Sequence, residues 1–98
     1  MVRYEVTADV EPALVERYES YMRGHHIPEI VATGCFARVR LDRASPTRYR
    51  LTCTAAARAD LDRYLAEHAP KLRSAFLGHL PTGVTLNREV WEDIPTEN

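Results

Sequence analysis

The stretch RGHHIPEIVATGCF, residues 23–36, decides the fold, because two glycines, a proline, two histidines and a cysteine lie close together in it. Gly24 suits the left-handed conformation that ends a helix, and Pro28 suits the first turn of a new one. The stretch therefore predicts a broken helix, with a long first part that ends near Gly24 and a short second part over residues 26–32. Gly34 then belongs to a turn that leads into a strand.

Alternation of apolar and polar side chains on both sides of this stretch predicts four strands. They are expected at residues 2–10, 35–42, 48–55 and 84–91. Helical spacing predicts a first helix from Pro12, a second at residues 56–68 and a shorter one from Pro70 to Gly78. The order βαββαβ predicts an α+β ferredoxin-like fold, a four-stranded antiparallel sheet with two interrupted helices on one face.

Composition and charge limit the function classes. The 98 residues are expected to form one domain over residues 1–93, followed by a polar tail at residues 94–98. Thirteen Lys and Arg against fourteen Asp and Glu give a net charge of −1, so neither nucleic acid nor a membrane is an expected partner. Cys35 and Cys53 lack metal-ligand spacing, and no signal-peptide pattern opens the chain, so we expect a cytoplasmic protein with reduced cysteines.

The sheet face away from the helices is expected to be polar. It is either a solvated surface or a homodimer interface, and the small core of a short chain favours the dimer. Arg and Glu side chains would set the register of that interface, and two aromatic side chains would anchor it. The expected interface residues are Phe36, Arg38, Arg40, Arg50, Glu89 and Trp91.

Three further stretches carry a family resemblance: RYEVT at residues 3–7, HHIPEI at 25–30 running into ATGCF at 32–36, and LDRYLAEHAP at 61–70. Together they resemble a family of short bacterial proteins catalogued as a domain of unknown function. The resemblance implies a dimeric α/β barrel related to the ferredoxin-like fold. Members of this wider superfamily include cofactor-independent monooxygenases, haem-degrading enzymes, isomerases, polyketide cyclases and ligand-sensing domains, so the fold does not choose an activity.

Histidines are the candidate acid/base residues. His25 and His26 are adjacent, so on a helix they point about 100° apart and do not form a metal-binding pair. His26, or else His25, is the candidate proton carrier beside a cleft; the alternative is that one histidine packs in the loop and the other is solvated. Asn87 and Trp91 do not match the positions used by haem-degrading relatives, and no cofactor or metal is predicted.

Tyrosines suggest a ligand pocket between the helices and the sheet. Buried hydroxyl groups need hydrogen-bond partners, and a concave site with a few polar tips is a common binding site. The alternative is that these rings only fill the core. The candidate ligand-binding residues are Tyr18, Tyr21, Tyr64 and His68, for a small aromatic or polyketide-like molecule.

The sequence thus predicts a homodimeric structural, interaction or small-ligand-binding module. The alternative is a cofactor-independent enzyme of monooxygenase, isomerase or cyclase type with a histidine acid/base.

Overall fold

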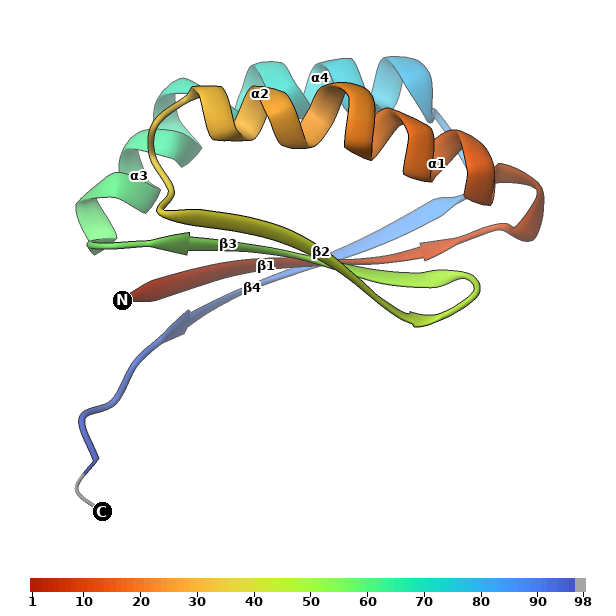
Figure 1. The fold of residues 1–98 in the computed structure, drawn as a ribbon. Coiled ribbons are helices and arrows are strands. Elements are labelled where there is room, and N and C mark those ends of the chain that lie inside the picture. The colour runs from red at the N-terminus through yellow and green to blue at the C-terminus, as the bar shows by residue number, and fades with distance from the viewer. Residues whose placement is uncertain (97–98) are drawn as a thin grey trace.

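The computed structural model describes residues 1–96, which form a four-stranded antiparallel sheet with all helices on one face (Figure 1). The strands lie in the order β2-β3-β1-β4. Their bounds are Val2–Val10 for β1, Arg38–Ser45 for β2, Arg48–Ala55 for β3 and Val84–Glu92 for β4. The ferredoxin-like βαββαβ fold expected from the sequence is confirmed.

Strand register separates the two faces of the sheet. Residues that pair across strands point to the same side, so Tyr4, paired with Cys53 and Val90, belongs to the face under the helices. Arg3 pairs with Thr54 and with Trp91 on the open face. All five tyrosines and both cysteines are buried, and all of them belong to one apolar core.

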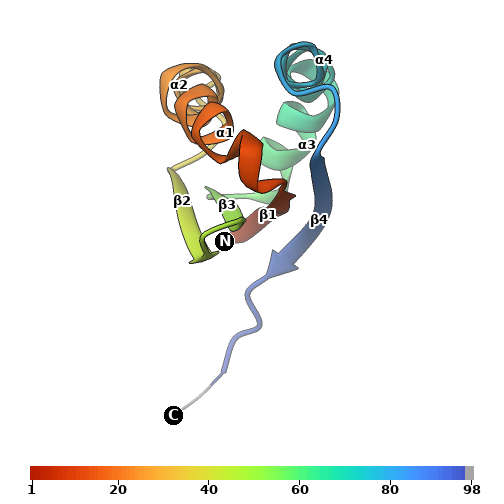
Figure 2. The ribbon, with the colours of Figure 1, turned by 90° about the vertical axis from the view of Figure 1, so that its right-hand side faces the viewer.

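The helices form two columns that run side by side over the sheet (Figure 2). One column contains η1 (Pro12–Leu14), α1 (Val15–Tyr21), η2 (Met22–His26) and α2 (Ile27–Ala32). The other contains α3 (Arg58–Glu67) and α4 (Ala69–His79). Pro70 interrupts the second column as expected, but α4, with 11 residues, is not shorter than α3, with 10.

The expected break at Gly24 is wrong, because the first column continues through this residue to Ala32. Gly24 is not among the glycines with positive φ, whereas Gly34, just after α2, has φ of 72°. The irregularity is instead a π-helical turn, in which the Ile27 N–H donates to the Met22 carbonyl five residues back. Pro28 explains it, since its ring clashes with a helical carbonyl four residues back and its nitrogen has no proton to donate.

Three side chains spaced by four residues along the first column face the sheet. Positions spaced by four lie on the same side of a helix. Tyr18, Met22 and His26 therefore lie on one side of the column. All three line the same space above the sheet.

The start of the second strand also differs from the sequence prediction. The second strand begins at Arg38 rather than at residue 35, so alternation does not apply to Phe36. Its ring packs against Tyr64 of α3, with the centroids 4.8 Å apart, under the helices and not on the open face. In the expected tail, residues 94–96 have no helix or strand, and residues 97–98 lie outside the described residues.

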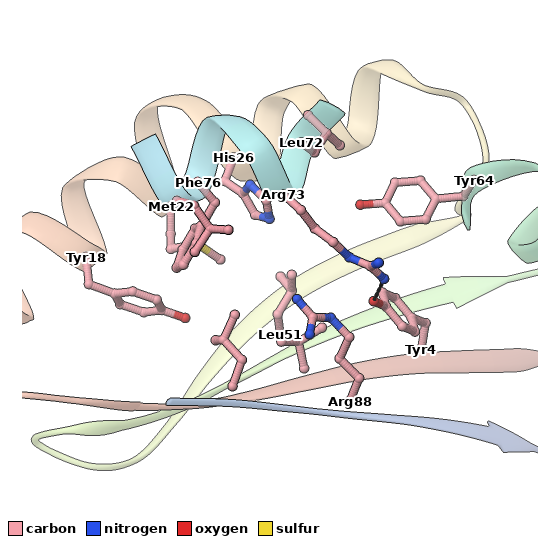
Figure 3. A pocket seen from close by; sticks show the side chains of 13 residues that line it. Tyr4, Tyr18, Met22, His26, Leu51, Tyr64, Leu72, Arg73, Phe76 and Arg88 are labelled. Carbon is pink, nitrogen blue, oxygen red and sulfur yellow. Dashed lines mark hydrogen bonds between the residues drawn. The ribbon is translucent and has the colours of Figure 1, made fainter. Parts of the chain in front are cut away.

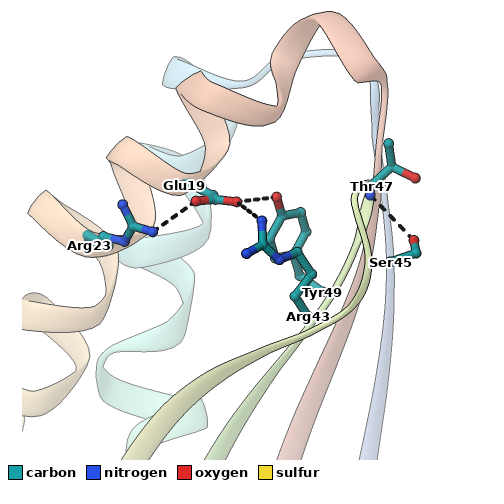
Figure 4. A network of polar contacts seen from close by, with 6 residues as sticks. All are labelled: Glu19, Arg23, Arg43, Ser45, Thr47 and Tyr49. Atoms are coloured by element: carbon teal, nitrogen blue, oxygen red, sulfur yellow. Dashed lines mark hydrogen bonds and ion pairs between the residues drawn. The ribbon is translucent and has the colours of Figure 1, made fainter.

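A polar network ties the β2–β3 hairpin to the first helical column (Figure 4). Glu19 of α1 accepts hydrogen bonds from the Tyr49 hydroxyl, from Arg43 and from Arg23. The Tyr49 hydrogen bond, followed by the two arginines, holds the pKa of Glu19 below its ordinary range although burial opposes this. The carboxylate is therefore charged at neutral pH and links α1 to the hairpin.

Alanine substitutions at two glycines test the course of the first column. Gly24→Ala is expected to stabilise the fold by about 0.5–1 kcal/mol, because Gly24 is helical and a Cβ there meets no atom within 4 Å. Gly34→Ala is expected to destabilise it by about 1 kcal/mol, because its positive φ strains any residue with a Cβ. Urea unfolding measures both, and a loss of stability at Gly24 would contradict the continuous helix.

Candidate functional site

A cavity of about 330 Å³ lies between the helices and the sheet (Figure 3). Both helical columns and three strands contribute to its wall, which is mainly apolar. Its lining residues are Tyr4, Val6, Tyr18, Met22, His26, Leu51, Tyr64, Leu72, Arg73, Phe76, Leu77, Leu86 and Arg88. The tyrosines therefore do not fill the space under the helices, and the volume lies in the range of small-molecule sites.

Polar tips from several elements point into this cavity (Figure 3). Arg73 of α4 reaches down to the sheet and donates to the Tyr4 hydroxyl at 3.3 Å. The Tyr18 and Tyr64 hydroxyls reach in from opposite ends, and burial raises the pKa of each phenol well above its ordinary value. Both therefore stay protonated and can donate hydrogen bonds to a bound molecule.

His26 is the titratable group nearest to neutral pH in the cavity wall. Its Nδ1 atom is buried and has no hydrogen-bond partner among residues 1–96. Burial lowers the pKa of His26 below its ordinary value of 6.5, the nearby Glu29 opposes this, and the positive charge of Arg88 adds to it. The imidazole is therefore neutral at pH 7 and can accept a proton or a hydrogen bond.

Three of the residues predicted from the sequence meet at the cavity: Tyr18, Tyr64 and His26. Three others do not line it. Tyr21 lies against His25 and His79, with ring centroids 5.6 and 4.5 Å away. The His68 ring stacks on the Tyr64 ring, with the ring centroids 6.3 Å apart.

Tyr4, Arg73 and Arg88 were not predicted as site residues. A signal for Arg88 was present, because it alternates with Val84, Leu86 and Val90 on the side of β4 that faces the helices. A charged side chain at such a position is a sign of a wet or functional site. Arg73 has no comparable signal in the sequence. The spacing of residues along a helix does not predict which exposed side chain reaches across to a cavity.

Residues 1–96 contain no metal-ligand cluster, no exposed cysteine and no membrane-spanning helix. No three His, Cys, Asp or Glu side chains in this range are grouped to hold a metal ion. Both cysteines are buried, and burial raises the pKa of Cys53 to about 12, so its thiol is protonated. In the same range, no helix has the length and apolar character of a membrane span.

The open face carries the other predicted residues. Trp91 is 48% exposed there, beside Arg3. Arg40 pairs with Asp42 at 3.0 Å, and Arg50 lies 4.0 Å from the same carboxylate. Arg38 and Glu89 make no ion pair within residues 1–96, and they lie on β2 and β4, at opposite edges of the sheet.

Comparison with protein families gives one match. Residues 1–94 match a family described as a domain of unknown function, DUF4286. No curated protein matches the chain.

Solved structures share the fold at low sequence identity. HapK from Hahella chejuensis has a TM-score of 0.75 at 11% identity, covering 100% of this chain and 97% of its own. An antibiotic biosynthesis monooxygenase has a TM-score of 0.69 at 17% identity, covering 97% of this chain and 100% of its own. A variant of SnoaB, a cofactor-independent oxygenase from Streptomyces nogalater, has a TM-score of 0.68 at 17% identity. The match covers 97% of this chain and 94% of the SnoaB chain. At these identities the likeness establishes the fold alone.

The titration of His26 tests the electrostatics of the cavity. We expect its pKa, measured by NMR of the imidazole, to lie below 6.5 in the wild type. Arg88→Gln removes a positive neighbour and should raise it, whereas Glu29→Gln removes a negative neighbour and should lower it further. Arg17→Gln, outside the cavity, serves as the control. A pKa at or above 6.5 in the wild type would contradict burial as the main influence on the imidazole.

Proposed function

This chain belongs to the DUF4286 family, and from this premise we propose that it is a homodimeric binding module whose cavity takes one small aromatic molecule. The observation that carries the proposal is an unfilled, mainly apolar cavity with convergent polar tips. The rings of Tyr4, Tyr18, Tyr64 and Phe76 offer flat surfaces to an aromatic ligand. The Tyr18 and Tyr64 hydroxyls and His26 supply the hydrogen bonds that orient it.

The homodimer part of the proposal rests on the open face of the sheet. A half-exposed tryptophan among arginines and a glutamate fits the composition of a protein interface. Arg38 and Glu89 carry opposite charges on opposite edges of this face, which suits a two-fold contact in which the surface meets itself. Arg40, Arg50 and Trp91 belong to the same proposed interface.

A second candidate function is a cofactor-independent enzyme in which His26 removes a proton from the bound aromatic molecule. The specific observation in its favour is a neutral imidazole in the cavity wall with a buried, unpartnered nitrogen. Tyr18 and Tyr64 would then orient the substrate as protonated phenols. The His26 titration bears directly on this candidate, because an imidazole that is protonated at pH 7 cannot act as the base.

Filling the cavity tests the binding function. The neutral probe 2-naphthamide is expected to shift the NMR signals of lining residues such as Val6, Leu51 and Leu86. Val6→Trp should abolish these shifts by occupying the space, while Val31→Trp, at an α2 position that is 57% exposed and outside the cavity, should leave them unchanged. Leu86→Phe provides a second filling variant if Val6→Trp fails to fold. Equal binding in the wild type and both filling variants would reject the cavity as the site.

Introducing a charge on the open face tests the dimer. Light scattering after size-exclusion chromatography is expected to give twice the chain mass for the wild type. Trp91→Glu should shift the measured mass towards that of the monomer, since it removes an apolar anchor and places a carboxylate close to Glu89. The matched control Val31→Glu changes an exposed apolar side chain on the helical side and should stay dimeric. A wild-type monomer at micromolar concentration would contradict the proposed dimer.

A further inference from the structure

The charges around the cavity are all of one sign. No Asp or Glu side chain is among the lining residues, whereas Arg73 and Arg88 both are. They come from different elements, α4 above and β4 below, and both guanidinium groups point into the space between them (Figure 3). Because His26 is neutral at pH 7, the wall carries two positive charges and no compensating negative one.

Neither arginine is engaged in an ion pair with any of the described residues 1–96. Within residues 1–96, most other arginines find a carboxylate, as Arg43 does with Glu19 and Arg48 with Asp9. The Arg73 guanidinium donates only to the neutral Tyr4 hydroxyl, and the Arg88 guanidinium has no hydrogen-bond partner in the same range. Their donors therefore remain available to a ligand, and guanidinium groups are well suited to the two oxygens of a carboxylate.

The two ends of the cavity differ in character. Phe76, Met22 and Tyr18 form an apolar end beneath the first helical column, and the phenol of Tyr18 and the imidazole of His26 are the polar groups there. The arginines lie exposed towards the β4 side, where solvent reaches them. A molecule with a flat ring at one end and a negative charge at the other matches this division.

We propose that the ligand is an aromatic carboxylate, with its ring against Tyr18 and Phe76 and its carboxylate between Arg73 and Arg88. This inference rests on the proposed binding function and specifies its ligand class. Tyr4 is a positioning residue, because its hydroxyl holds the Arg73 guanidinium over the sheet.

The matched probes 2-naphthoate and 2-naphthamide test the inference, since they share one ring system and differ in charge. At pH 7 we expect naphthoate to bind about tenfold more tightly than naphthamide by calorimetry. Arg73→Gln and Arg88→Gln should each weaken naphthoate binding about tenfold and change naphthamide binding by less than about twofold. Arg17→Gln removes an exposed arginine outside the cavity and should change neither.

The outcomes separate the ligand class from the binding function. Equal affinity for the two probes would overturn the carboxylate while leaving an aromatic binding site in place. No binding of either probe would overturn both. Equal weakening by Arg17→Gln and Arg88→Gln would also overturn the inference, because attraction would then come from the overall charge and not from the cavity.

Discussion

Pro28 imposes the constraint that shapes the first helical column. A proline in the middle of a helical column has no N–H to donate, and its ring excludes the ordinary helical contact with the carbonyl four residues earlier. The column continues by forming a π turn at η2 instead of breaking. Met22 and His26 of this turn and Tyr18 of the preceding α1 line the cavity together. The candidate site therefore depends on a helical column that stays continuous up to Pro28.

Burial and charge then give this space its chemical character. Burial keeps the phenol of Tyr18 protonated and the imidazole of His26 neutral, so the apolar end offers hydrogen bonds without charge. Arg73 and Arg88 add positive charge at the solvent side. Such a division orients a ligand that has one apolar and one anionic end. The open face of the sheet is left for contact with a second copy of the chain.

Most of the fold is predictable from the sequence because strand alternation and helical spacing reflect burial directly. Gly24 was misjudged because glycine accepts helical as readily as left-handed conformations. Pro28 did not decide between them, since proline fits the first turn of a new helix as well as the position after a π turn. Phe36 was misjudged because alternation was applied to residues before the strand begins. His26, Tyr18 and Tyr64 were identified as candidates, but Arg73 was not, since only the folded chain shows which long side chain reaches across a cavity.

Native mass spectrometry of the protein purified from its own host would decide whether the chain is a ligand-carrying dimer, because it measures assembly and bound ligand together. We expect a dimer mass that carries a small molecule, with an aromatic carboxylic acid released on denaturation. A monomer mass without any bound molecule would contradict it.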